Sequence, residues 1–310
     1  MTEDSGREIA LLLGGVIPER ESEMKDYLER YTPVFSRCDD RPGFFIEAGP
    51  YGILKFTQRT MHQMWILGFA ANQALHSYSS ALAILRLNSG KLDTNTIMHL
   101  PGQEKENEKY AELIDSVYKL SQVNSPSDFI WPSRVPIPEK KPSDIEGAAT
   151  FDLICMAGAY VFLHEMKHIA FSQDGTAPAN AHEEEHQCDQ FAKQMMLSEI
   201  EAYSKQSGYD LGRLITKRAM SISLALFYML VITPQKSWAG TETHPSIKRR
   251  IESLVNDLSI HDDDILWIYM ASLFLAHLLH INDQPLILQF ATLKNLTINL
   301  ISVIEESSKQ

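Results

Sequence analysis

The chain has 310 residues, of which 44% are hydrophobic and 22% charged, so it can bury a sizeable core and does not have the composition of a disordered protein. Its formal net charge of −12 argues against a nucleic-acid-binding protein, because such proteins are usually basic. Cys38, Cys155 and Cys188 are widely spaced, and the acidic N-terminus lacks the positive charge of a signal peptide. We therefore expect a cytoplasmic protein without a disulfide framework.

The first 125 residues predict a helical region that contains a β-hairpin. Residues 8–17 predict a strand or a short helix, and the polar segment 19–31 predicts a helix that Pro33 ends. Residues 44–47 and 51–56 flank Ala48-Gly49-Pro50, a pattern typical of a hairpin. Helical spacing then extends over 60–87 and 104–120, and residues 91–102 predict a loop between these helices.

Residues 126–258 predict the catalytic core. A segment with five prolines, residues 125–143, favours a linker, with a rim over the site as the alternative, and its apolar stretches can only be edge or loop segments. A helix capped by Asp144 runs past His168. Further helices are expected from about 181, over 210–233 and over 243–254, the last with Pro245 in its first turn.

Residues 259–310 predict two more helices, interrupted at 282–285, that pack on the core. Two apolar segments, 219–232 and 265–281, were compared with membrane spans, which need about 20 predominantly apolar residues. The first is too short, and Ser272, His277 and His280 interrupt the second. We expect both segments to be buried core helices.

The segment His164-Glu165-x-x-His168 indicates a metal site. Residues four apart lie on one face of a helix, so both imidazoles can bind one zinc ion while Glu165 acts as general base on zinc-bound water. The pattern also arises by chance, and the alternative is a polar stripe with two hydrogen-bonded histidines. Lys167 occupies a position that is usually uncharged in zinc peptidases, although its ammonium can reach solvent.

A third ligand is available on the next predicted helix. Glu185 and Asp189 are four residues apart, so Glu185 can bind the metal while Asp189 accepts a hydrogen bond from a ligand histidine. The alternative is an acidic helix N-terminus in solvent, stabilised by the helix dipole. Three further residues remain alternative ligands: Glu184, His182 and His186.

A later histidine, His244, stands between Thr243 and Pro245, just before a predicted helix. Held there, it can donate a hydrogen bond to the oxyanion of a tetrahedral intermediate. The alternative is a solvated surface histidine.

Taken in order, the three motifs resemble those of the gluzincin metallopeptidases. They are similar to the HtpX and CAAX-prenyl-protease type, whose third ligand lies in a Glu-x-x-Ala-Asp helix and whose later His-Pro motif precedes a helix. Those proteins carry obvious membrane spans, however, so in length and soluble character the chain is more similar to the Lit-type phage-exclusion peptidases. The resemblance covers about residues 150–255.

The resemblance implies a mainly α (α+β) fold with a zincin-like core, built from an active-site helix and a glutamate helix with small edge strands. Carried over by position, it implies zinc ligands His164, His168 and Glu185, general base Glu165, supporting residue Asp189 and transition-state donor His244.

For the Lit type, the resemblance implies a cytoplasmic zinc protease that cleaves the translation factor EF-Tu when a phage protein triggers it. The alternatives are a membrane-associated HtpX-like quality-control peptidase and a zinc-containing interaction protein without turnover. Glu165 argues against the latter, because a structural zinc site needs no base.

Overall fold

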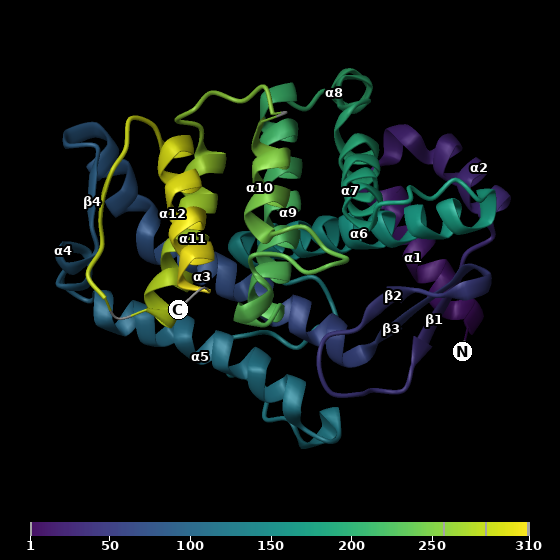
Figure 1. Cartoon of the computed structure of the whole chain (residues 1–310), viewed down its shortest axis with the longest axis horizontal. Helices are drawn as coiled ribbons and strands as arrows, with labels where there is room; N and C mark the ends of the chain where they lie inside the picture. The colour runs from purple at the N-terminus through teal and green to yellow at the C-terminus, as the bar shows by residue number, and fades with distance from the viewer. Residues whose placement is uncertain (1, 257, 283, 309–310) are drawn as a thin grey trace.

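Two long helices, α3 (Gln58–Asn88) and α6 (Ile145–Asp174), cross the molecule and carry most of the packing (Figure 1). The computed structural model describes residues 2–256, 258–282 and 284–308. Helices account for 69% of it and strands for 6%, which confirms the mainly α prediction. One hydrophobic core includes residues from the N-terminal, central and C-terminal regions, among them Leu13, Leu163 and Leu300.

The N-terminal region begins with α1 (Thr2–Val16) and α2 (Glu21–Tyr31), so residues 8–17 form a helix and not a strand. The hairpin is confirmed: β2 (Ile46–Ala48) pairs antiparallel with β3 (Ile53–Thr57). A further strand, β1 (Val34–Cys38), pairs in parallel with the other side of β3. The sheet order is therefore β1-β3-β2, and β2 is an edge strand.

The predicted loop at 91–102 is wrong. It contains strand β4 (Lys91–Asp93) and helix α4 (Thr94–Met98), and β4 pairs antiparallel with β5 (Ile287–Gln289) near the C-terminus. The helix after it, α5 (Gln103–Gln122), packs along α3. Buried Arg59 of α3 donates to the carbonyls of Leu120 and Val123, which are left free at the C-terminal end of α5.

Helix α6 is stabilised at both ends. The Asp144 carboxylate accepts a hydrogen bond from the Gly147 backbone at 2.7 Å, which confirms the predicted cap. Gly175 ends the helix with φ of +64°, a conformation that glycine adopts without strain. The proline-rich segment 125–143 before α6 packs as a loop against α3, where the Trp65 indole donates to the Pro136 carbonyl at 2.7 Å.

Four helices follow α6 in the central region. They are α7 (Ala181–Leu197), α8 (Ile200–Ser207), α9 (Leu211–Ile232) and α10 (Ile247–Asn256). Both α7 and α9 pack directly on α6. As expected, two helices follow, α11 (Ile265–Ile281) and α12 (Leu293–Ser307); of the predicted interruption, residue 283 lies outside the described residues.

Two helices, α6 and α9, are long and apolar enough to cross a membrane by length and composition alone. The α9 helix begins at Leu211, which makes it longer than the apolar segment 219–232 suggests. Half of the apolar window of α6 and 67% of that of α9 are buried inside the protein. Core helices that are buried in this way pass the same composition test.

Candidate active site

The two histidines of the motif lie one above the other on α6. Their Nε2 atoms are 3.3 Å apart. Glu185 of α7 faces both rings, with Oε2 at 3.5 Å from Nε2 of His164 and Oε1 at 3.4 Å from Nε2 of His168. Glu185 is only 8% exposed. One carboxylate and two imidazole nitrogens therefore converge on a common point.

The Nδ1 atom of each ring is hydrogen-bonded to a different carboxylate of α7. Nδ1 of His164 donates to Asp189 at 3.0 Å, and Nδ1 of His168 donates to Glu184 at 2.8 Å. Such bonds fix the ring orientation and, when the ring is neutral, the tautomer that leaves the Nε2 lone pair free. Glu184, an alternative third ligand from its spacing, thus lies on the side of His168 away from Glu185.

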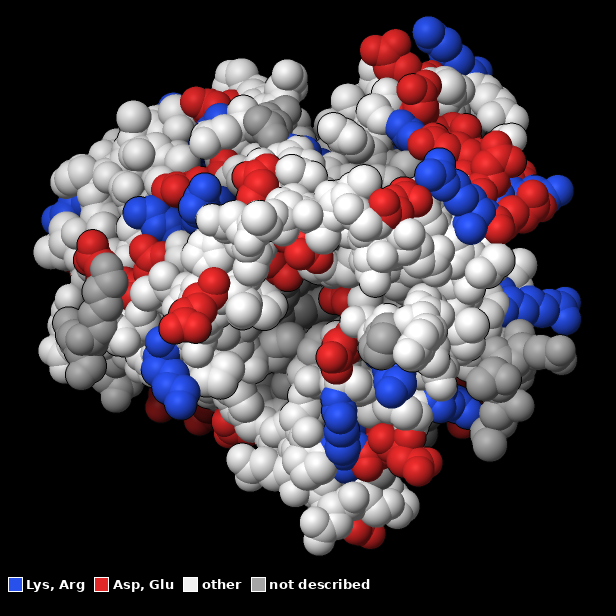
Figure 2. All heavy atoms as spheres, turned by 45° about the vertical axis from the view of Figure 1, so that its right-hand side comes forward, with Lys and Arg blue, Asp and Glu red and all other residues white. Residues whose placement is uncertain are grey.

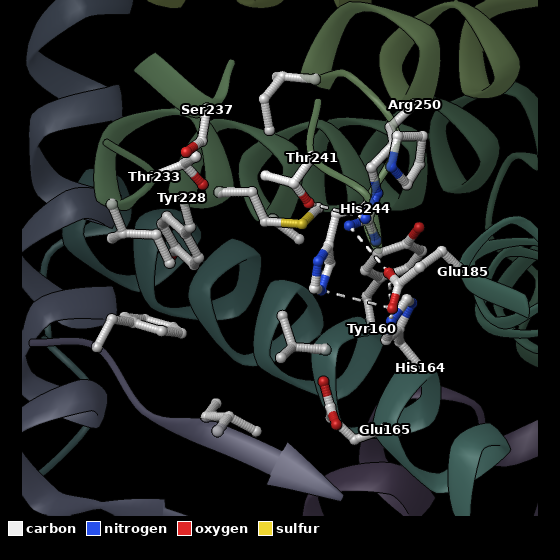
Figure 3. A pocket seen from close by; sticks show the side chains of 18 of the residues that line it. Tyr160, His164, Glu165, Glu185, Tyr228, Thr233, Ser237, Thr241, His244 and Arg250 are labelled. Atoms are coloured by element: carbon white, nitrogen blue, oxygen red, sulfur yellow. Dashed lines mark hydrogen bonds and ion pairs between the residues drawn. The ribbon is translucent and has the colours of Figure 1, made fainter. Parts of the chain in front are cut away.

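Buried Arg250 of α10 joins two of the carboxylates of α7, those of Asp189 and Glu185. Its side chain is 7% exposed, its Nε donates to Asp189 Oδ2 at 2.7 Å, and its Nη2 donates to Oδ1. A third nitrogen, Nη1, lies 3.4 Å from Oε2 of Glu185 (Figure 3). The Tyr160 hydroxyl also donates to Asp189, at 3.0 Å. No sequence spacing indicates these roles for Arg250 and Tyr160, although the His-Pro motif contains Arg250.

These contacts determine the charges of the site. Burial alone would raise the pKa of Asp189, but Arg250 and His164 hold it well below its usual range. Burial would likewise raise the pKa of Glu185, and its contacts with His164 and His168 keep it low. Burial would lower the pKa of His164, but hydrogen bonds to Asp189 and Glu185 raise it to about 9. Both carboxylates are therefore ionised at neutral pH.

Glu165 turns away from the histidines and reaches the edge strand β2. Its Oε2 accepts a hydrogen bond from the Ala48 backbone N–H at 2.8 Å, and its side chain lies apart from Glu185 and His244 in the close view (Figure 3). The sequence cannot indicate this contact, because the donor is a backbone group. One oxygen of Glu165 is thus held by β2, and the carboxylate lies at the wall of a cleft that Ile46, Glu185 and His244 also line.

His244 lies on the opposite side of the cleft, in a turn before α10. Its side chain is 60% exposed, and its Nε2 is 3.7 Å from Oε1 of Glu185. Its Nδ1 is hydrogen-bonded to the Thr243 hydroxyl at 2.8 Å. Pro245 was expected in the first helical turn, but α10 begins two residues later, at Ile247, because the backbone first completes the turn between Thr241 and His244.

Comparison with known proteins was made at the level of families, curated proteins and solved structures. The family model for peptidase U49 matches residues 54–270, more than two thirds of the chain. The chain belongs to the peptidase U49 family. This is a Lit-like family of peptidases, so the Lit-type resemblance is confirmed at the level of the family. No curated protein and no solved structure matches the chain.

Two cavities flank the converging groups of His164, His168 and Glu185. We call one, of about 380 Å³, the apolar cavity, because Phe44, Val161 and Met229 are among the residues that line it. The other, of about 520 Å³, we call the acidic cavity, because four carboxylates line it: Glu47, Glu165, Glu184 and Glu185. Ile46, Glu165, Glu185 and His244 border both cavities. The face in Figure 2 is hollowed near its centre, with acidic side chains around the hollow.

Two further residues near the two histidines, Lys167 and Cys188, have distinct surroundings. The Lys167 ammonium lies 4.2 Å from the centre of the Phe171 ring and 5.5 Å from that of Phe191, so this residue joins α6 to α7 by cation–π contacts. Cys188 is fully buried, and its thiol lies within 4.8 Å of ligand atoms of His164 and His168, a set that can hold a metal ion. Burial raises the pKa of this thiol.

Proposed function

We propose that this U49 family member is a zinc-dependent endopeptidase in which His164, His168 and Glu185 hold the metal. The observation that carries the proposal is the spacing of the three groups, 3.3, 3.4 and 3.5 Å. Two ligands of a tetrahedral zinc ion with bonds of about 2.0–2.1 Å are about 3.3 Å apart. The donor set, two imidazoles and one carboxylate, is also a known catalytic set that leaves one position open.

Cys188 is the competing third ligand, but the geometry favours Glu185. Both Nε2 atoms lie within 3.5 Å of a Glu185 carboxylate oxygen. The ligand atoms of His164, His168 and Cys188, by comparison, lie within 4.8 Å of one another. Glu185 also borders both cavities, so a metal ion held by it would be accessible to substrate. Cys188 lines neither cavity.

Bound zinc would supply Lewis acidity to the scissile carbonyl and to the attacking water. Glu165 would take a proton from that water and deliver it to the leaving amine nitrogen. The Ala48 N–H holds one oxygen of Glu165, so the other oxygen performs the transfer. If the Thr243 hydroxyl donates to Nδ1 of His244, Nε2 carries the proton and can donate to the oxyanion across the cleft.

The edge strand β2 suits an extended peptide substrate. Ala48 pairs opposite Leu54, yet its N–H points away from β3 toward Glu165. Because backbone groups alternate along a strand, Ile46 presents its N–H and C=O to the same side. Ile46 borders both cavities, so we propose that the substrate backbone lies along β2 while its side chains enter the apolar and acidic cavities.

Glu165→Gln tests the proposed function. The variant should fold and bind one zinc ion per chain, as the wild type does, but should not cleave its substrate. Cells that express either protein can be compared for new protein termini. Absence of stoichiometric zinc from the purified wild type, or cleavage by the variant at the wild-type rate, would refute the proposal.

We further propose the Lit-type role: a cytoplasmic enzyme that cleaves EF-Tu after a phage protein triggers it. Membership in a Lit-like family supports this finer reading. The same terminus comparison tests it, because a new terminus in a protein other than EF-Tu would replace the proposed substrate.

A membrane-associated HtpX-like peptidase is the second candidate, because α6 and α9 have the length and composition of membrane spans. Recovery of the active protein in the detergent-free supernatant, free of membranes, would exclude that candidate.

A further inference from the structure

The turn that carries His244 is tightly formed but exposed. Its backbone closes through a hydrogen bond from the Thr241 N–H to the His244 carbonyl at 2.9 Å, and the His244 N–H donates to the Thr241 hydroxyl at 3.0 Å. Gly240 precedes it with φ of +98°, and a side chain there would meet the His244 carbonyl at 3.2 Å. Residues 241–244 are all exposed. The turn is therefore well defined internally, but few neighbours cover it.

One side chain of α7 reaches across to this turn. Nε2 of His182 donates to the Thr241 carbonyl at 2.8 Å. His182 is held in place in turn, because its own backbone N–H is capped by the Asn180 side chain at 2.8 Å. His182 was one of the alternative metal ligands by spacing, and the structure instead turns its Nε2 to a backbone carbonyl.

We infer that His182 is a positioning residue that fixes His244 relative to the zinc ligands; this inference rests on the proposed function. His182 and Glu185 are one helical turn apart on α7. The hydrogen bond from His182 to the Thr241 carbonyl therefore attaches the loop turn that carries His244 to the same helix that carries the proposed ligand. The direct approach of His244 to Glu185, at 3.7 Å, is too long for a hydrogen bond. We call the hydrogen bond from His182 to the Thr241 carbonyl the tether. The tether therefore sets the distance between His244, the proposed oxyanion donor, and the proposed metal site.

The test compares His182→Ala and His182→Gln with His186→Ala. Like His182, His186 is on α7, is partly buried and lines neither cavity, but among the described residues no hydrogen bond joins it to the turn that carries His244. With a quenched fluorescent peptide that spans the cleaved bond, His182→Ala should lower kcat about tenfold, the effect of losing roughly one hydrogen bond. KM and zinc affinity should stay within twofold of the wild type. Glutamine, which also has an N–H donor, should restore most of kcat, and His186→Ala should match the wild type.

Two readouts separate positioning from a general structural effect. Amide hydrogen exchange in residues 240–246 should be faster in His182→Ala than in His186→Ala, a measurement that needs neither zinc nor activity. In a His244→Ala background, His182→Ala should have no further effect on kcat.

Equal exchange rates in the two variants, or losses of kcat that multiply with that of His244→Ala, would overturn the inference. A wild type without zinc or cleavage would instead refute the proposed function, and the exchange comparison would still decide whether the tether exists.

Discussion

Replacement of Arg250 by methionine tests the buried network behind the proposed zinc ligands. The Asp189 side chain is 13% exposed and accepts hydrogen bonds from His164, Tyr160 and twice from Arg250. Methionine has a similar length but no donor, so the variant removes the buried guanidinium and both of its hydrogen bonds to the Asp189 carboxylate. Breaking a buried ion pair from one side costs about 3–5 kcal/mol. We therefore expect the zinc-free protein to lose about that much of its unfolding free energy.

Zinc affinity should fall as well, because Arg250 contacts both the proposed ligand Glu185 and Asp189, which positions His164. Loss of such support typically weakens metal binding about 10- to 100-fold. Urea unfolding in the presence of a chelator measures the first effect, and competition with a chromophoric chelator measures the second.

Arg249→Met is the matched control. Arg249 is the neighbouring residue in the chain, is exposed, and has no ion pair among the described residues, so its loss should change stability by less than about 0.5 kcal/mol. If Arg250→Met destabilises the protein by less than about 1 kcal/mol and leaves zinc affinity within twofold of the wild type, the structural argument for the network is wrong.

Two further predictions concern other buried groups. Glu185→Ala should remove most zinc from the purified protein, whereas Glu184→Ala should lower its content less, because Glu184 lies against Nδ1 of His168; equal losses by metal analysis would reassign the ligand. Burial lowers the pKa of fully buried His277 to about 3, against an ordinary value of 6.5. Below pH 6.5 the unfolded state therefore binds a proton that the folded state does not. The unfolding free energy consequently decreases as the pH is lowered. Compared with His277→Phe, the wild type should lose about 2 kcal/mol more of its unfolding free energy between pH 7.5 and pH 5. Parallel pH profiles in urea unfolding would contradict this.

Local patterns predicted the helices well. The expected helix at 60–87 is α3, at Gln58–Asn88, and Asp144 caps α6 as its side-chain type indicates. Pairing between distant segments was not predictable in the same way. Strand β1 has five residues and pairs in parallel with β3, and β4 finds its partner β5 almost 200 residues later. Short strands carry little periodic signal, and the partner decides whether they form.

In the candidate site, too, local spacing was predictable but contacts between distant segments were not. The spacing in the sequence predicted that His164, His168 and Glu185 lie together. Residues four apart share a helix face, and α7 follows α6 directly. The partners that hold them depend on how separate helices pack. Arg250 comes from α10, and the donor to Glu165 is the backbone of Ala48, which no residue type can indicate.

The edge strand β2 also bears on how much of the chain the chemistry requires. The family match begins at Leu54, yet β2 and the Ala48 N–H that binds Glu165 lie before that point. A protein shortened to begin at Leu54 would retain every residue of the three motifs but lose one wall of both cavities. It would also free the carboxylate of Glu165 to rotate. The proposed catalysis would then depend on a segment that precedes the residues matched by the family model, and on the sheet that attaches it.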